Sequence, residues 1–276
     1  MAALAVALLV AAQPASADVP AQRHFDRVLI IVLENKDYGD AVRDAYLESL
    51  GKRGALLTGY HGLSHPSYNN YLGLVAGRVF DVEGDEQQTL DGPTVADLLE
   101  ARGLRWKAYA EGFPGHCFTG AFKGRYARKH MPFLSIRAIQ ANPARCARIV
   151  NASQFKRDRA NPPDYALYVP DQYDDGHDTG LAYASSWLKG FLEPLLADPA
   201  YMKGTLLAVT FDESRTGLFN HIYTVLLCAM VRPGSRNDRR LDHFSLLRTI
   251  EMNFGLGAMA EGDREATPIE EVWIGR

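Results

Sequence analysis

The run Val28-Leu29-Ile30-Ile31-Val32-Leu33 predicts the central strand of the protein, and Glu34 and Asn35 follow it directly. The six residues are apolar without alternation and rich in β-branched side chains, a pattern typical of a strand buried on both faces of a sheet. In open α/β sheets, ligands and catalytic groups collect beyond the carboxyl ends of the strands. The position of Glu34 and Asn35 therefore indicates a functional site.

Other apolar runs predict the rest of the sheet. Strand-like segments span residues 106–110, 165–169, 206–211 and 223–231. Helical patterns lie between several of them, at residues 94–102, 181–194 and 244–254. Alternating strand and helix patterns predict the α/β class, with a mainly parallel central sheet and helices on both faces. Residues 115–159 break the alternation, and we expect an irregular insertion there, over the active-site face.

The composition is ordinary for a compact enzyme. The chain has 276 residues, of which 47% are hydrophobic and 23% are charged, and its net charge is -3. A single domain over residues 18–276 fits this length. With 30 basic and 33 acidic residues, the chain lacks the broad positive charge that holds a nucleic-acid backbone, so we expect no nucleic-acid partner.

Residues 1–17 predict export. They form an apolar stretch ending in Ala15-Ser16-Ala17, the small-x-small pattern at which signal peptidases cleave, although the usual basic residue at the start is missing. The stretch is too short to span a bilayer comfortably, and no other segment of the sequence could do so. We therefore expect a secreted or cell-envelope protein whose mature chain has no transmembrane segment.

Three cysteines are an odd number for an exported chain. Cys228 lies in an apolar, strand-like run, which is typical of a small buried hydrophobic residue. The simplest arithmetic then pairs Cys117 with Cys146 in a disulfide that closes an irregular region. Free thiols at both positions are the alternative.

Asp212 and Glu213 repeat the pattern of Glu34 and Asn35, because they also follow an apolar strand directly. Carboxylates that meet in one crevice raise one another's pKa, and a divalent cation removes this penalty. Oxygen-rich ligation predicts Mg, Mn, Ca or Zn, with one or two ions. Any one of these acidic residues, taken alone, is more often the solvated end of a loop.

Ser67 ends the turn Ser64-His65-Pro66-Ser67, which precedes apolar residues at helical spacing. A hydroxyl at the start of a helix can be deprotonated by a metal and act as a nucleophile, and the first backbone amides of the helix can hold phosphate. The alternative interpretation is that Ser67 or Ser64 simply caps the helix.

The run Asp174-Asp175-Gly176-His177-Asp178 places a histidine among three aspartates, just past a predicted strand. This pattern suggests ligands for a second metal, with His221 as their partner. The alternatives are a polar loop in which Asp178 caps the next helix, and a structural role for His221.

A basic cluster could neutralise phosphate or approach an anionic lipid surface; a solvated loop is equally plausible. Its members are Lys123, Arg125, Arg128, Lys129 and His130.

Taken together, these motifs resemble the phosphoesterase family of bacterial secreted acid phosphatases and phospholipases C, within the alkaline-phosphatase-like superfamily. The resemblance covers nearly the whole mature chain. Its landmarks are VLIIVLEN (28–35), HPSYNNYLGLVAG (65–77), YARKHMPF (126–133), VPDQYDDGHD (169–178), TFDE (210–213), NHIYTVLL (220–227) and HFSLLRTIEMNFGL (243–256). The chain length favours the small secreted acid-phosphatase branch, some of whose members act on phosphoinositides.

The resemblance implies roles for individual residues. The implied metal ligands are Glu34, Asn35, Asp212 and Glu213, with Asp174 and His221 as further candidates. The implied catalytic residues are Ser67 as nucleophile, His130 and His177, and the implied substrate-binding residues are Asn70 and Lys129. Two departures from the family pattern matter. Asn69 replaces the usual Pro before Asn70, and the acidic residues before His177 lack the four-residue Asp-to-His spacing of two-metal members, so the second metal stays open.

We therefore predict a secreted, metal-dependent phosphoester hydrolase. It would be an acid phosphatase that cleaves phosphomonoesters of small molecules or lipid headgroups through a phosphoserine intermediate. One alternative is a phosphodiesterase of the phospholipase C type, with the same centre and a wider, more apolar mouth. A second is a metal-free serine hydrolase, for which the G-x-S-x-G element is missing. A third is an exported binding protein that keeps the cleft without turnover.

Overall fold

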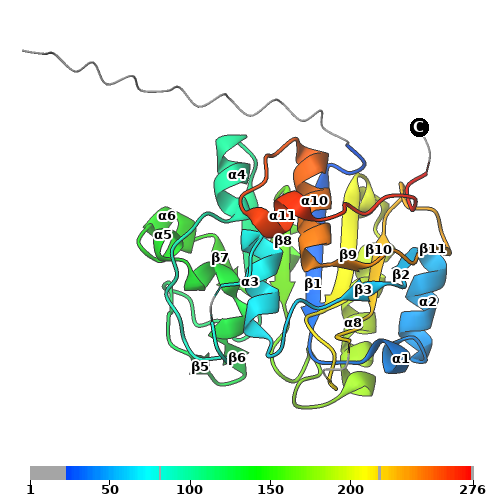
Figure 1. The fold of residues 1–276 in the computed structure, drawn as a ribbon, viewed down its shortest axis with the longest axis horizontal. Coiled ribbons are helices and arrows are strands. Elements are labelled where there is room, and N and C mark those ends of the chain that lie inside the picture. Colours follow the sequence, from blue (N-terminus) through cyan, green and yellow to red (C-terminus); the bar gives the residue numbers. More distant parts are fainter. Residues whose placement is uncertain (1–22, 81, 217–218, 275–276) are drawn as a thin grey trace, which may run out of the picture.

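The centre of the molecule is a sheet of eight strands in the order β11-β2-β10-β9-β1-β8-β4-β7 (Figure 1). The structure is a computed structural model, and it describes residues 23–80, 82–216 and 219–274. The predicted signal peptide, residues 1–17, lies outside the described residues.

Five neighbouring strands of this sheet are parallel. They are β9 (Thr205–Phe211), β1 (Arg27–Leu33), β8 (Tyr165–Val169), β4 (Trp106–Ala110) and β7 (Ile149–Asn151). The predicted strands at 106–110 and 165–169 have these bounds. Every residue from Val28 to Leu33 is buried, because helices cover both faces of the sheet at β1.

The remaining strands of the sheet lie beyond β9. β10 (Thr224–Leu227) is antiparallel to β9 and to β2 (Ala55–Leu57), and β11 (Ser235–Asn237) is parallel to β2. The strand predicted to run to Val231 ends at Leu227, and Cys228, predicted to be a small buried hydrophobic residue, packs against the core from a position just outside it. Cys228 is partly buried just past the strand.

Helices cover both faces, as predicted (Figure 1). In front of the sheet in this view lie α3 (Tyr68–Ala76), α4 (Val95–Ala101), α10 (His243–Phe254) and α11 (Glu261–Glu265). Behind it lies α8 (Leu181–Leu196), which packs against α2 (Ala45–Arg53). The short helices α1 (Tyr38–Ala41) and α9 (Pro199–Met202) follow β1 and α8. α10 ends at Gly255, whose φ of 65° is the left-handed conformation that glycine adopts without strain.

The segment expected to be an irregular insertion, residues 115–159, consists of short elements. They are the pair β5 (Phe122–Lys123) and β6 (Tyr126–Ala127), the 3-10 helices η1 (Arg128–His130), η2 (Pro132–Ser135) and η3 (Ala152–Gln154), and the helices α5 (Arg137–Gln140), α6 (Pro143–Cys146) and α7 (Phe155–Asp158). The predicted disulfide joins Cys117 to Cys146. The segment also supplies β7, the edge strand of the main sheet, so it is integral to the domain.

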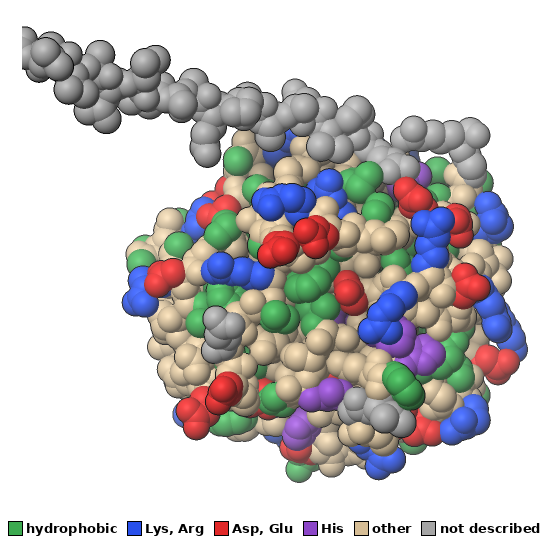
Figure 2. All heavy atoms as spheres, in the orientation of Figure 1, with side chains coloured by type: hydrophobic (Ala, Val, Ile, Leu, Met, Phe, Trp, Pro, Cys, Tyr) green, Lys and Arg blue, Asp and Glu red, His purple; other side chains and the backbone are tan. Residues whose placement is uncertain are grey.

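A second small sheet pairs β3 (Tyr60–His61) with β12 (Leu241–Asp242). None of the described helices is long and apolar enough to cross a membrane. Basic and acidic side chains are interspersed over the face shown in Figure 2.

Candidate active site

The candidate site begins where β1 and β9 end side by side. Leu33 pairs with Phe211 in the parallel register, so Glu34 and Asp212 leave the sheet as neighbours. Asp212 N donates to Leu33 O at 2.9 Å, and Asn35 N donates to Asp212 Oδ1 at 3.0 Å. The structure thus brings together the two carboxylate clusters that the sequence placed at separate strand ends.

The side chain of Asn35 belongs to the same group of polar atoms. Its φ of 44° is left-handed, a conformation that asparagine tolerates better than most residues. Turned with its nitrogen toward the carboxylates, the amide donates to Asp212 Oδ1 at 3.0 Å and Glu34 Oε2 at 3.1 Å. Turned with its oxygen toward them, the amide adds another oxygen to the cluster, as a cation would require.

Ser67 points into this cluster from the start of α3. Its Oγ lies 3.2 Å from Glu34 Oε2, 3.2 Å from Glu213 Oε1 and 3.5 Å from Asn35 Oδ1. The residue is buried, and its hydroxyl makes no capping bond to the helix. The interpretation of Ser67 as a simple helix cap is therefore not supported by its side-chain geometry.

The other oxygen of Glu34 faces an aromatic pair. Tyr71 OH donates to Glu34 Oε1 at 2.5 Å, and His130 Nε2 lies 3.4 Å from the same oxygen. The rings of Tyr71 and His130 stack with centroids 5.0 Å apart. Because Tyr71 lies one helical turn after Ser67 on α3, that helix positions both a hydroxyl at the centre and a support for Glu34.

Asp175, not Asp174, faces the centre. Asp175 is fully buried, and its Oδ2 lies 3.7 Å from His130 Nδ1. Asp174 belongs to a separate, partly buried group with Glu111 and Asp171. The turn after β8, in which Asp175 N donates to Asp171 O at 2.8 Å, directs the two adjacent side chains differently.

Lys36 links the loops that follow β1 and β8 through hydrogen bonds. Its Nζ donates to Glu34 O at 3.0 Å, Asn35 O at 3.1 Å and Gly176 O at 3.0 Å. Glu34 N also donates to Asp175 O at 3.0 Å. The loops after β1 and β8 are therefore held against each other on either side of Glu34.

The cluster places several carboxyl groups close together away from water, and this raises their pKa values. Burial, followed by the charges of Asp212 and Asp175, raises the pKa of Glu34 well above its usual range. Burial also raises the pKa of Asp212 to about 6, and the pKa values of Asp175 and Glu213 to about 8. Without a counter-charge, these carboxylates cannot all ionise.

Several buried atoms in and around the cluster have no hydrogen-bond partner among the described residues, and two of them belong to side chains that could bind a metal. These two are His130 Nε2 and Asp175 Oδ2. Burial keeps the pKa of His130 well below its usual range, so this imidazole is neutral and has a nitrogen lone pair available for a metal. Glu34, His130 and Asp175 each offer one ligand atom, all within 4.8 Å of one another. The donor set of carboxylates, amide, hydroxyl and imidazole suits a divalent cation such as Mg, Mn, Ca or Zn.

Lys129 supplies positive charge at the edge of the cluster. Its side chain is mostly buried, and its charge lowers the pKa of Glu34, Asp212 and Glu213. His177 lies nearer the surface, where its Nδ1 contacts Asp178 Oδ1 at 2.7 Å.

The other predicted site residues have structural partners. Asn70 Oδ1 accepts from Leu63 N at 2.7 Å and Ser64 N at 3.2 Å, so Asn70 holds the turn before Ser67. His221 Nε2 contacts Thr58 O at 2.9 Å, and its ring stacks between Tyr38 and His61. The structure does not bring Asn70 or His221 into direct contact with the carboxylate cluster.

Sequence reasoning missed several residues of the site. His65 Nδ1 lies 2.6 Å from Glu213 Oε2, at the partly exposed mouth. Its place two residues before Ser67 was the available signal. Tyr71 could have been found from its spacing of four residues from Ser67 on the predicted helix. Nothing in the sequence pattern distinguished Asp175 from Asp174 or identified Lys36.

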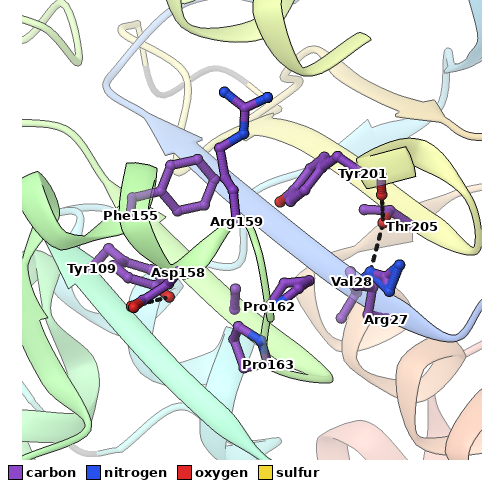
Figure 3. Close-up of a pocket in the computed structure, with 11 residues that line it drawn as sticks. Arg27, Val28, Tyr109, Phe155, Asp158, Arg159, Pro162, Pro163, Tyr201 and Thr205 are labelled. Atoms are coloured by element: carbon purple, nitrogen blue, oxygen red, sulfur yellow. Dashed lines mark hydrogen bonds between the residues drawn. The ribbon is translucent and has the colours of Figure 1, made fainter. Parts of the chain in front are cut away.

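A separate small pocket lies at the amino end of β1, where Arg27 Nε donates to Thr205 Oγ1 at 2.8 Å (Figure 3). Its lining includes the apolar rings of Phe155 and Tyr201. A strand of seven residues is about 23 Å long. The pocket is therefore remote from Glu34 and does not belong to the candidate site.

Sequence comparison identifies relatives of this chain. A model of the phosphoesterase family matches residues 40–257, which include Ser67, His130, Asp175 and Asp212. A probable acid phosphatase of Kluyveromyces lactis is 36% identical over 263 residues, which are 90% of this chain and 62% of that protein. An acid phosphatase of Aspergillus fumigatus is 32% identical over 263 residues, 90% of this chain and 59% of that protein. The chain thus spans about three fifths of the length of these two fungal relatives.

A further relative and two solved structures are also similar to this chain. A phosphatidylinositol-3-phosphatase of Mycobacterium tuberculosis is 30% identical over 256 residues, 90% of this chain and 83% of that protein. An alkaline phosphatase superfamily protein from Vibrio parahaemolyticus has a TM-score of 0.63 at 14% identity, over 88% of this chain and 69% of its own. A phosphonate monoester hydrolase of Agrobacterium radiobacter has a TM-score of 0.57 at 13% identity, over 90% and 79%. The structural likeness shows the shared fold, and the sequence match over most of the chain shows that this protein belongs to the phosphoesterase family.

Proposed function

We propose that the protein is a metal-dependent phosphoester hydrolase that acts on phosphomonoesters with Ser67 as its nucleophile. The position of Ser67 Oγ carries the proposal, because it lies 3.2 Å from carboxylate oxygens of both Glu34 and Glu213. Buried carboxylates around a hydroxyl at a helix start are a suitable setting for a metal-activated nucleophile. Membership of the phosphoesterase family supports the same reaction class.

The chain offers enough ligands for one or two cations. Glu34, Asn35, Asp212 and Glu213 would hold the first, beside Ser67. Glu34, His130 and Asp175 form a set that could share in a second. A bound cation would neutralise the carboxylates and lower the pKa of the Ser67 hydroxyl.

The residues of the chain suit a two-step reaction. Ser67 Oγ attacks phosphorus in line, the bond from phosphorus to the leaving oxygen breaks, and that oxygen takes up a proton. Water then attacks the phosphoserine, the bond from phosphorus to Ser67 Oγ breaks, and the serine regains its proton. Lys129 would stabilise the charge on the non-bridging oxygens, and His130 would act through the second ligand set, where it would help to hold a cation beside the phosphoryl group.

His177 is the candidate for proton transfer to the leaving group. It lies close enough to His130 for its charge to lower the pKa of that buried imidazole. Its side chain is one third exposed, which allows exchange of protons with water. Replacing His177 with Gln should therefore slow esters of poorly acidic alcohols more than p-nitrophenyl phosphate, whose leaving group needs no proton.

A substrate panel, run with and without divalent ions, tests the proposal. The panel contains p-nitrophenyl phosphate, bis-p-nitrophenyl phosphate, phosphatidylinositol 3-phosphate and phosphatidylcholine. We expect hydrolysis of the monoesters, loss of activity after exhaustive chelation, and recovery when one of the four candidate metals is restored. Preference for the diester or for phosphatidylcholine would indicate a phosphodiesterase instead. Full activity without metal would contradict the metal proposal.

We also propose that the protein is exported. The disulfide between Cys117 and Cys146 supports an oxidising compartment, because such bonds are rare in reducing cytosol. Expression with and without residues 1–17, followed by fractionation of the host cells, tests this proposal. Retention of the full-length chain in the cytosol with residues 1–17 uncleaved would contradict it.

A further inference from the structure

Asp85 occupies two hydrogen-bond donors beside the proposed nucleophile. Its Oδ1 accepts from Tyr68 N at 3.2 Å, and its Oδ2 lies 2.5 Å from Lys129 Nζ. Tyr68 is the first residue of α3 and follows Ser67 directly. Tyr68, Asp85 and Lys129 line the same small pocket. A carboxylate of the chain therefore bridges a backbone amide and an ammonium group next to Ser67.

The charged residues of this pocket lie close enough to the centre of the site to change the pKa values of its carboxyl groups. The charge of Lys129 lowers the pKa of Glu34 and Asp212, and the charge of Asp85 raises the pKa of Glu213. The Lys129 side chain is only 11% exposed, whereas that of Asp85 is 32% exposed. The surrounding residues therefore restrict the Lys129 side chain, whereas the more exposed Asp85 side chain has room to rotate into solvent.

The two donors have the chemistry of a phosphate contact. An ammonium group and an amide at a helix start both favour an anion with several acceptor oxygens. We propose that Asp85 sets the affinity of the site for phosphate, because its carboxylate competes with the substrate phosphate for Lys129 and the Tyr68 amide. The inference rests on the proposed function, because it places the phosphoryl group at Ser67. Phosphate must displace Asp85 to bind, and Asp85 favours release of inorganic phosphate after hydrolysis.

The loop around Asp85 allows such an exchange. On one side, Asn69 Nδ2 donates to Val82 O at 3.1 Å, and on the other, Gln87 Nε2 donates to Thr119 O at 2.6 Å. Gly84 has a left-handed φ of 73° and open space around it. The flanks of the loop are fixed, so rotation of the Asp85 side chain is enough to free both donors.

Calorimetric titration with inorganic phosphate tests the inference on the full chain in the presence of Mn²⁺. Asp85→Asn removes the charge and keeps an oxygen for the Tyr68 amide, whereas Asp85→Ala removes both. We expect each variant to lower the Kd of phosphate by roughly two- to fivefold, the scale of one partly exposed ion pair. The control is Asp91→Asn. Asp91 lies on the same loop but pairs with Arg137 at the surface, so its phosphate affinity should equal that of wild type.

Adding Lys129→Met shows whether the gain passes through the proposed contact. In the Lys129→Met background, Asp85→Asn should produce less than half of the fold-gain seen with Lys129 present. A purely structural Asp85 would give a different result: Asp85→Asn would match wild type, and Asp85→Ala would lose stability without binding phosphate more tightly. Either unchanged or weaker phosphate binding by Asp85→Asn would overturn the inference.

Turnover of p-nitrophenyl phosphate by wild type is measured in parallel, because it reports on the proposed function separately. An active wild type whose Asp85→Asn variant gains no phosphate affinity would refute the role of Asp85 and leave the proposed function standing. A wild type that neither turns over the ester nor binds phosphate would refute both. Thermal unfolding of each variant establishes that the compared proteins are folded.

Discussion

Ser67 Oγ lies 3.2 Å from Glu34 Oε2, although 33 residues separate the two in the chain. Glu34 is placed by the end of the central strand β1, and Ser67 by the start of α3, which covers one face of the sheet. Tyr71, one turn along α3, donates to the other oxygen of Glu34 at 2.5 Å. Hydrogen bonds to Glu34 therefore join the start of α3 to the end of β1 at the candidate active site.

Replacing Ser67 with Ala should abolish hydrolysis of p-nitrophenyl phosphate while leaving the melting temperature close to that of wild type. The hydroxyl makes no capping bond to α3, so its loss removes the proposed nucleophile without weakening the helix start. Ser64→Ala is the control, since the nearby Ser64 hydroxyl has no hydrogen-bond partner among the described residues. Near wild-type activity in Ser67→Ala would refute the nucleophile assignment.

Asp175→Asn and Asp174→Asn, two isosteric changes at adjacent positions, should have different effects. Asp175 faces His130 in the buried cluster, so its loss should reduce Mn²⁺ affinity or activity by about 10- to 100-fold, as for other groups that orient metal ligands. Asp174 lies with Glu111 and Asp171 instead, in a separate group that could itself hold a metal ion, so its replacement should change activity by less than about threefold. Calorimetric titration with Mn²⁺ and initial rates measure both. Equal losses of activity in the two variants would contradict the geometry described above.

Tyr71→Phe should lower the free energy of unfolding by about 1–3 kcal/mol, because it removes a hydrogen bond to the buried carboxyl group of Glu34. The phenyl ring can still stack on His130, so the loss isolates the hydroxyl. Tyr165→Phe is the matched control, since the buried Tyr165 hydroxyl has no partner among the described residues. Urea unfolding measures both variants. A Tyr71→Phe protein as stable as Tyr165→Phe would argue against a structural role for this bond.

Glu251 lies outside the candidate site, and its raised pKa should make the stability of the protein depend on pH. It is fully buried in α10, and burial, followed by the Asp263 carboxyl group, raises its pKa from 4.5 to about 9. Between these two values the native state keeps a proton that the unfolded chain has released. Stability contributed by the protonated group is therefore lost as pH rises through this window, at up to about 1.4 kcal/mol per pH unit.

Glu251→Gln should remove this dependence, because an amide does not ionise. The variant should gain stability relative to wild type as the pH is raised from 5 to 9, and the difference is measured by urea unfolding across that range. Glu261→Gln serves as the control, since Glu261 is exposed at the start of α11. Parallel pH profiles for wild type and Glu251→Gln would contradict a raised pKa at Glu251.

The strand ends were predictable because local patterns determine them. An apolar run followed by a carboxylate identifies both a buried strand and the edge of the sheet where it ends, and Leu33 paired with Phe211 confirms that Glu34 and Asp212 meet there. The family resemblance was equally readable, since it rests on short stretches of consecutive residues. The end of β10 was not predictable, because the apolar run continues past Leu227 into a turn.

The directions of side chains within the loops could not be predicted from the sequence. Asp174 and Asp175 are the same residue type in the same run, and only the turn closed by Asp175 N and Asp171 O decides which of them faces His130. The bonds of Lys36 to three carbonyl oxygens likewise depend on two loops from distant parts of the chain. The α/β sheet, the edge that carries the candidate site and the candidate nucleophile could be predicted from the sequence, because these follow from patterns between near neighbours. The three-dimensional structure was needed to show which acids share the centre and that Asp85 pairs with Lys129, because contacts between distant loops depend on the path of the whole backbone.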